Sequence, residues 1–100
     1  MLKKALIVSA LLISSANAHT AVMSCFDNGD GTITCEGGFS DGSSGSGISM
    51  YIKQNDRKIV QGQMNEDSEF TFNKPKGKYS VHFDAGKGHV VSIKGKDIVE

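Results

Sequence analysis

Three histidines, His19, His82 and His89, are the residues of this chain best suited to bind a metal ion. If the chain is cut just before His19, that residue offers two nitrogen atoms to one ion, its α-amine and its ring Nδ1. A second histidine then completes a T-shaped or square set of nitrogen ligands, which suits Cu(II) or Ni(II). Both nitrogens must be deprotonated to bind, and their ordinary pKa values are about 8 and about 6.5, so affinity should rise across that range. The alternative is that His19 is a frayed terminal residue without a ligand.

The first residues of the chain decide whether His19 becomes a terminus. Lys3 and Lys4 precede a short apolar run, and Ala16-Asn17-Ala18 has the small-x-small pattern of a cleavage site. The run is far shorter than the roughly 20 residues that a membrane-spanning helix needs. Residues 1–18 are therefore predicted to be a signal peptide that directs the protein to the periplasm or outside the cell; the alternative is an uncleaved anchor.

Removal of the signal peptide changes the composition of the protein. Of the 82 residues left, 26 are apolar, which is about 32% and low for a globular domain, whereas all 12 glycines remain. The formal net charge changes from zero to −2, because two lysines are lost. Residues 19–100 are predicted to form one domain, too small for a large enzyme cleft. We expect no enzyme, since the carboxylates are scattered, and no nucleic-acid binding, since there is no basic excess.

Cys25 and Cys35 are the only cysteines of the chain. An oxidising compartment favours a disulfide between them, and closing a loop this small stabilises a fold by about 3 kcal/mol. A redox or metal-binding role for the pair is the alternative, although the spacing is not C-x-x-C.

The elements that must position these side chains are short strands. Apolar and polar residues alternate in runs separated by Gly, Asn, Asp and Ser, which is typical of an all-β protein. The pattern predicts a single small seven-stranded antiparallel β-sandwich. Its strands are expected at 21–26, 32–36, 48–53 and 58–63, around Phe70 and Phe72, at 79–84 and at 89–94.

Two connections have predicted roles. If Cys25 faces Cys35, the first two strands form a hairpin in which Phe26 faces Thr34, with its turn around residues 29–31. Residues 40–47, rich in Ser and Gly, are interpreted as a flexible connection with no core residue.

The strand pattern also places the candidate ligands. His89 opens the last strand with the parity of Val91 and Ile93, so it is expected at the rim of the core. His82 has the opposite parity and is expected on a solvated face, which makes it a poor candidate for a ligand. Asp84 lies beside the loop that carries His89, so it could bind the metal or accept a hydrogen bond from a ligating histidine.

Residues 26–37 partly match a calcium-binding loop. Asn28, Asp30 and Gly31 fit its third, fifth and sixth positions, but Phe26 stands at the first and Gly37 at the twelfth. The first ligand and the bidentate Glu are therefore missing. We interpret the segment as a turn and expect no Ca²⁺ site.

A series of motifs runs from Gly38-Phe39-Ser40-Asp41-Gly42 to Asp84-Ala85-Gly86-Lys87-Gly88-His89, with Gln61-Gly62-Gln63, Glu69-Phe70-Thr71-Phe72, Pro75 and Gly77-Lys78-Tyr79 between them. The series resembles the carboxypeptidase-regulatory-like, or transthyretin-like, β-sandwich. More narrowly, it resembles the small periplasmic accessory proteins of energy-coupling-factor nickel/cobalt transporters, whose signal peptide ends close to a histidine.

That resemblance implies a Ni²⁺ or Co²⁺ site with His19 and His89 as ligands, Asp84 as a further candidate, and Gly86 and Gly88 shaping the loop. It also implies a membrane transporter component as partner. Three features depart from the family pattern: Lys87 stands where Met is frequent, no membrane helix follows the last strand, and the cysteine pair looks like an addition.

Three functions follow as hypotheses. The first is capture of Ni²⁺ or Co²⁺ by His19 and His89 for a membrane uptake system. The second is binding of Cu²⁺ through the same N-terminal histidine, because Cu(II) outcompetes the other ions at nitrogen sites. The third is a non-catalytic structural or adhesion module.

Overall fold

A computed structural model describes residues 20–100 of the chain; the predicted signal peptide and His19 lie outside the described residues. The described part contains seven strands and one 3₁₀ turn, so the predicted seven-stranded all-β fold is confirmed. The elements are β1 (Ala21–Asp27), β2 (Thr32–Phe39), β3 (Ser49–Gln54), β4 (Arg57–Gln63), β5 (Glu69–Asn73), β6 (Ser80–Asp84), β7 (Val90–Lys94) and η1 (Gly95–Asp97). Over the same residues, no helix is long and apolar enough to cross a membrane.

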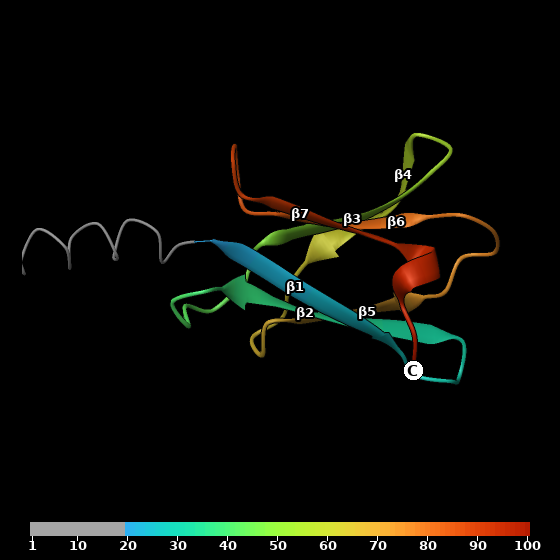
Figure 1. Cartoon of the computed structure of the whole chain (residues 1–100), viewed down its shortest axis with the longest axis horizontal. Coiled ribbons are helices and arrows are strands. Elements are labelled where there is room, and N and C mark those ends of the chain that lie inside the picture. Colours follow the sequence, from blue (N-terminus) through green and yellow to red (C-terminus); the bar gives the residue numbers. More distant parts are fainter. Residues whose placement is uncertain (1–19) are drawn as a thin grey trace, which may run out of the picture.

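The strands form two antiparallel sheets that pack face to face (Figure 1). One sheet has the order β1-β2-β5 and the other the order β4-β3-β6-β7. Because successive strands run in opposite directions, every connection falls at one of two ends of the domain. We call them the Thr20 end, which holds loops 40–48, 64–68 and 85–89, and the Glu100 end, which holds the remaining turns and η1.

The core lies between the two sheets and is small. Alternation turns one side of each strand inward, and the most buried side chains come from both sheets, from the β4–β5 loop and from the segment after η1. They are Ala21, Ile33, Cys35, Met50, Ile52, Met64, Phe72, Val81, Phe83 and Ile98. Val91 and Ile93, predicted to point inward, are partly buried and pack against this cluster. No charged or polar residue is fully buried among residues 20–100.

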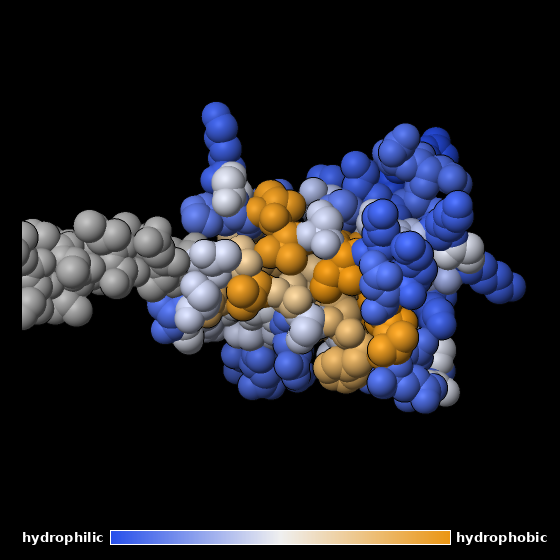
Figure 2. All heavy atoms as spheres, in the orientation of Figure 1, coloured by the Kyte–Doolittle hydropathy of each residue, from blue (hydrophilic) through white to orange (hydrophobic). Residues whose placement is uncertain are grey.

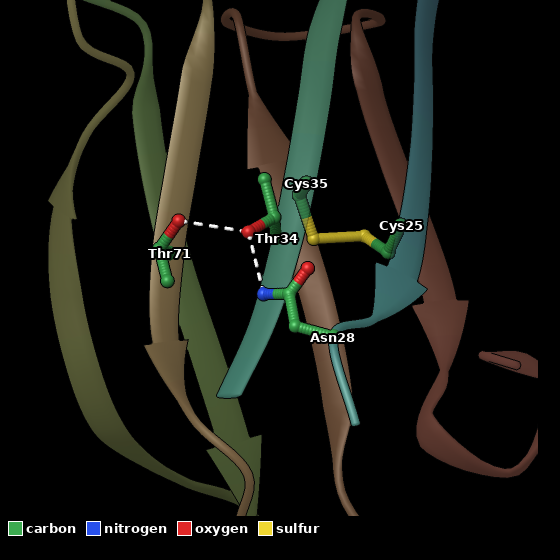
Figure 3. The surroundings of a disulfide bond; sticks show 5 residues. All are labelled: Cys25, Asn28, Thr34, Cys35 and Thr71. Carbon is green, nitrogen blue, oxygen red and sulfur yellow. Dashed lines mark hydrogen bonds between the residues drawn. A yellow bond between two sulfur atoms is a disulfide. The ribbon is translucent and has the colours of Figure 1, made fainter. Parts of the chain in front are cut away.

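The first hairpin has the predicted register. Cys25 pairs with Cys35 across the β1–β2 ladder, their sulfur atoms form a disulfide, and Phe26 lies opposite Thr34. The Cα–Cα distance of 4.0 Å matches the closely spaced, non-hydrogen-bonded type of cross-strand pair. Figure 3 shows how a polar network next to the disulfide continues across the sheet: Asn28 Nδ2 donates to Thr34 Oγ1 at 2.9 Å, and Thr34 Oγ1 lies 2.9 Å from Thr71 Oγ1 of β5.

The Ser/Gly-rich segment 40–47 is more fixed than the sequence indicates. Ser44 forms an isolated bridge with Gly38, and the Gly45 amide donates to Ser68 Oγ at 3.0 Å. Gly45 is buried, and a Cβ there would lie 2.2 Å from the carbonyl oxygen of Gly37. The interpretation as a flexible connection is therefore wrong, because these glycines let two stretches of backbone pack in contact.

Removing the disulfide should destabilise the domain without changing its fold. The ring closed by Cys25 and Cys35 is short, so the Cys25→Ala/Cys35→Ala variant is expected to lose about 3 kcal/mol of unfolding free energy. Urea unfolding of the two proteins measures the difference. A reductant should lower the stability of the parent by a similar amount and leave that of the variant unchanged; an equal effect on both would contradict the assignment.

Candidate functional site

His89 lies on the β6–β7 hairpin at the Thr20 end and is exposed to solvent. It precedes the first residue of β7 instead of opening the strand, and it belongs to the turn. Its amide donates to the Gly86 carbonyl at 2.9 Å, and its own carbonyl accepts from the Ala85 amide at 3.0 Å. The residue is therefore exposed at the end of the domain, just outside the β6–β7 ladder.

Asp84 and two glycines hold the hairpin in shape. Asp84 is half-buried at the end of β6, and its Oδ1 accepts from the Gly86 amide at 3.0 Å. Gly86 and Gly88 have φ values of 110° and 83°, a left-handed region that other residues avoid. The Asp-x-Gly-x-Gly-His spacing is therefore what this turn requires: one carboxylate oxygen closes the loop, and two glycines allow the reversal that leaves His89 exposed.

His82 occupies a different environment, on the outer face of the four-stranded sheet. Its Nε2 lies 2.7 Å from Ser80 Oγ and its Nδ1 lies 2.8 Å from Ser92 Oγ. Its ring stacks on the ring of Tyr51, with centroids 4.7 Å apart and planes 12° from parallel. Both nitrogens thus have hydroxyl partners, and metal binding would have to break one of these hydrogen bonds.

The pKa of His82 is held below its ordinary value of 6.5, first by burial of the ring and then by the charges of Lys53 and Lys58. Lys58 Nζ lies 4.3 Å from the centroid of the Tyr51 ring, which in turn stacks on His82. The imidazole is therefore neutral at pH 7, with one nitrogen donating and the other accepting. Serine hydroxyls can complement either arrangement.

Charge is distributed unevenly between the two ends of the domain. The Thr20 end carries six carboxylates and one lysine, a formal net charge of −5, and the Glu100 end carries eight cations and five carboxylates, a formal net charge of +3. The first set is Glu36, Asp41, Glu66, Asp67, Glu69, Asp84 and Lys87. The near-neutral total hides this separation, which appears only when the topology assigns each loop to an end. Figure 2 shows many hydrophilic side chains at the right-hand end of the molecule and several apolar side chains over the middle of this face.

The structure brings together two of the predicted ligands, His89 and Asp84, on one hairpin, and it places His82 on another surface. His19 lies outside the described residues. Within residues 20–100, no group of three or more His, Cys, Asp or Glu side chains is arranged to hold a metal ion. A metal site built on the hairpin would therefore need a ligand from elsewhere, such as the nitrogens of His19.

Sequence reasoning missed the surroundings of His82. The signal was present, since Tyr51, His82 and Ser92 all have the outward parity of their strands. Only the strand order β4-β3-β6-β7 shows that Tyr51 and Ser92 flank His82 on neighbouring strands.

No protein-family model matches the chain, and searches of curated proteins and of solved structures return no match.

Lysine charge should contribute, after burial, to the lowered pKa of His82. Replacing Lys53 and Lys58 by Gln removes two positive charges that disfavour the imidazolium, so the pKa of His82 is expected to rise toward 6.5. Histidine side-chain NMR during a pH titration measures the shift. The control is Lys87→Gln, at the far end of the domain, which should leave the His82 midpoint unchanged; no rise in the double variant would contradict this electrostatic account.

Proposed function

We propose that this protein is an exported metal-binding accessory domain, which captures Ni²⁺ or Co²⁺ for a membrane uptake system. The observation that carries the proposal is the β6–β7 hairpin, which exposes His89 beside Asp84 at the end of the domain where the described chain begins. The resemblance of the Asp84–His89 motif to the nickel/cobalt accessory proteins adds support.

The proposed ligands are the α-amine and Nδ1 of His19 together with the imidazole of His89. Asp84 already accepts one hydrogen bond through Oδ1, and Oδ2 accepts none from the other described residues, so it could bind the ion or orient a ligand. The negative Thr20 end would raise the local concentration of divalent cations. An exposed hairpin also suits an accessory protein, because an ion must be released to the next carrier.

Cu²⁺ binding is the second candidate, because the ligand set itself favours it. An amine with two imidazoles binds Cu(II) more tightly than Ni(II) or Co(II) in solution. Affinity measured with purified protein therefore does not identify the ion used in the cell, and a genomic neighbour that encodes a nickel or cobalt permease would favour the first candidate.

The central prediction is that the mature protein binds one Ni²⁺ through His89. Intact mass should show that the exported chain begins at His19, and calorimetric titration at pH 7.5 should give one ion per chain. His89→Ala is expected to weaken binding at least tenfold, because it removes one nitrogen ligand. The matched control is His82→Gln, which removes a histidine whose nitrogens both have serine partners and should change the affinity less than twofold.

Two further measurements test the role of the terminus. An additional alanine before His19 moves the α-amine away from the imidazole and should reduce affinity as much as the loss of His89. Affinity should also fall as pH decreases from 8 to 6, since both nitrogens of His19 become protonated. The proposal fails if His89→Ala binds Ni²⁺ as tightly as the parent protein.

A further inference from the structure

A cavity of about 780 Å³ lies at the Glu100 end, remote from the hairpin of His89. Its walls are the β5–β6 loop and the segment that follows β7. Four lysines line it, Lys74, Lys78, Lys94 and Lys96, together with the Tyr79 ring and the apolar side chain of Ile98. No arginine and no carboxylate belongs to its lining.

The walls of this cavity are held by specific contacts. Gln54 Nε2 donates to the carbonyls of Lys76 and Lys78, at 2.6 and 3.0 Å, and so fixes the β5–β6 loop to the end of β3. The Gly95 amide donates to the Tyr79 carbonyl at 2.9 Å, which joins the two walls. Gly95 also lies directly against the Tyr79 ring, because a Cβ there would be 2.4 Å from a ring atom. The cavity is therefore shaped by the backbone and by a packed ring.

The charge around the cavity is largely unpaired. Lys74 Nζ lies 2.8 Å from Asp27 Oδ2, an ion pair that raises the pKa of the lysine. By contrast, Lys78, Lys94 and Lys96 form no ion pair with any residue between 20 and 100. Three lysines thus line one cavity without a carboxylate bound to them, which favours an anion from outside the domain.

Tyr79 supplies an independent observation. Its hydroxyl oxygen is shielded from solvent and has no hydrogen-bond partner within residues 20–100, an arrangement that proteins seldom retain. Burial raises the pKa of the phenol, so the group remains protonated and is a potential donor at neutral pH. Because Tyr79 is one of the residues that line the cavity, this unpaired donor belongs to its wall.

We propose that the cavity binds the phosphate group of an organic phosphate. Lysine ammoniums are compact point charges that bind phosphate oxygens, as the lysine of a phosphate-binding loop does. The Tyr79 ring and Ile98 can contact the carbon part of the ligand. The volume is typical of a small-molecule site. An adjoining groove of about 410 Å³ shares Lys78 and Tyr79 and adds Lys53, which leaves room for a larger ligand.

This proposal does not depend on metal binding, since the hairpin of His89 and the cavity lie at opposite ends. Glycerol 3-phosphate is the soluble probe, and glycerol is its uncharged control. In amide NMR spectra, glycerol 3-phosphate is expected to shift the resonances of residues 77–79 and 94–96 in a saturable manner, and glycerol is expected to shift none. Raising the salt concentration should weaken the binding.

Two triple variants with the same loss of charge separate a built site from general attraction. Lys78→Gln/Lys94→Gln/Lys96→Gln should weaken binding at least tenfold. Arg57→Gln/Lys58→Gln/Lys87→Gln alters cations outside the cavity lining and should weaken it less than threefold. Equal losses in the two variants would overturn the proposal, because they would show attraction to the overall charge only.

Vesicles distinguish the source of the phosphate. Sedimentation with phosphatidylcholine vesicles that contain phosphatidylglycerol, and with pure phosphatidylcholine vesicles, tests a lipid headgroup. Saturable binding of glycerol 3-phosphate identifies a soluble ligand. Binding only to the phosphatidylglycerol vesicles, lost in the first triple variant and kept in the second, identifies a headgroup. Binding to neither probe overturns the proposal.

Discussion

The two sheets are joined by a reciprocal contact between aromatic rings and glycines. The Phe83 ring of the four-stranded sheet packs where a Cβ on Gly37 of the three-stranded sheet would lie, only 2.5 Å from a ring atom. In return, the Phe70 ring of the three-stranded sheet occupies the corresponding space beside Gly62, also at 2.5 Å. The domain has few apolar residues, and it buries more apolar area by packing large aromatic rings directly against the backbone of glycines. Either glycine replaced by alanine would force the sheets apart or displace a ring.

The same device supports both candidate sites. Phe83 immediately precedes Asp84, so the ring that joins the sheets also anchors the strand from which the His89 hairpin projects. At the other end, the Tyr79 ring against Gly95 fixes the segment that carries Lys94 and Lys96. Each candidate site is thus attached directly to a packed aromatic ring. A small core suffices to position the two sites, because the residues that pack against or carry these rings are adjacent in the chain to the functional residues.

Local patterns of the sequence predicted much of this fold, whereas contacts between distant segments were not predictable. Alternation located seven strands, and the two cysteines set the register of the first hairpin, because both are properties of neighbouring residues. Nothing local shows that β5 pairs with β2, or that Gly37 makes room for Phe83. From the sequence, the glycines were interpreted as loop formers and segment 40–47 as flexible. The residues that pack against a glycine lie far away in the chain, so neighbouring residues do not reveal them.

The separation of charge is a consequence of topology, and it allows the two ends to act independently. A seven-residue strand spans about 23 Å, whereas the Debye length at physiological ionic strength is about 8 Å. An ion near the Thr20 end therefore experiences the local charge of −5, with little influence from the lysines at the far end, and the reverse holds at the Glu100 end. Net charge near zero is consequently a poor guide to the ligands of this domain. Its antiparallel strands collect acidic loops at one end and basic turns at the other, so cations and anions are attracted to opposite ends of the same small fold.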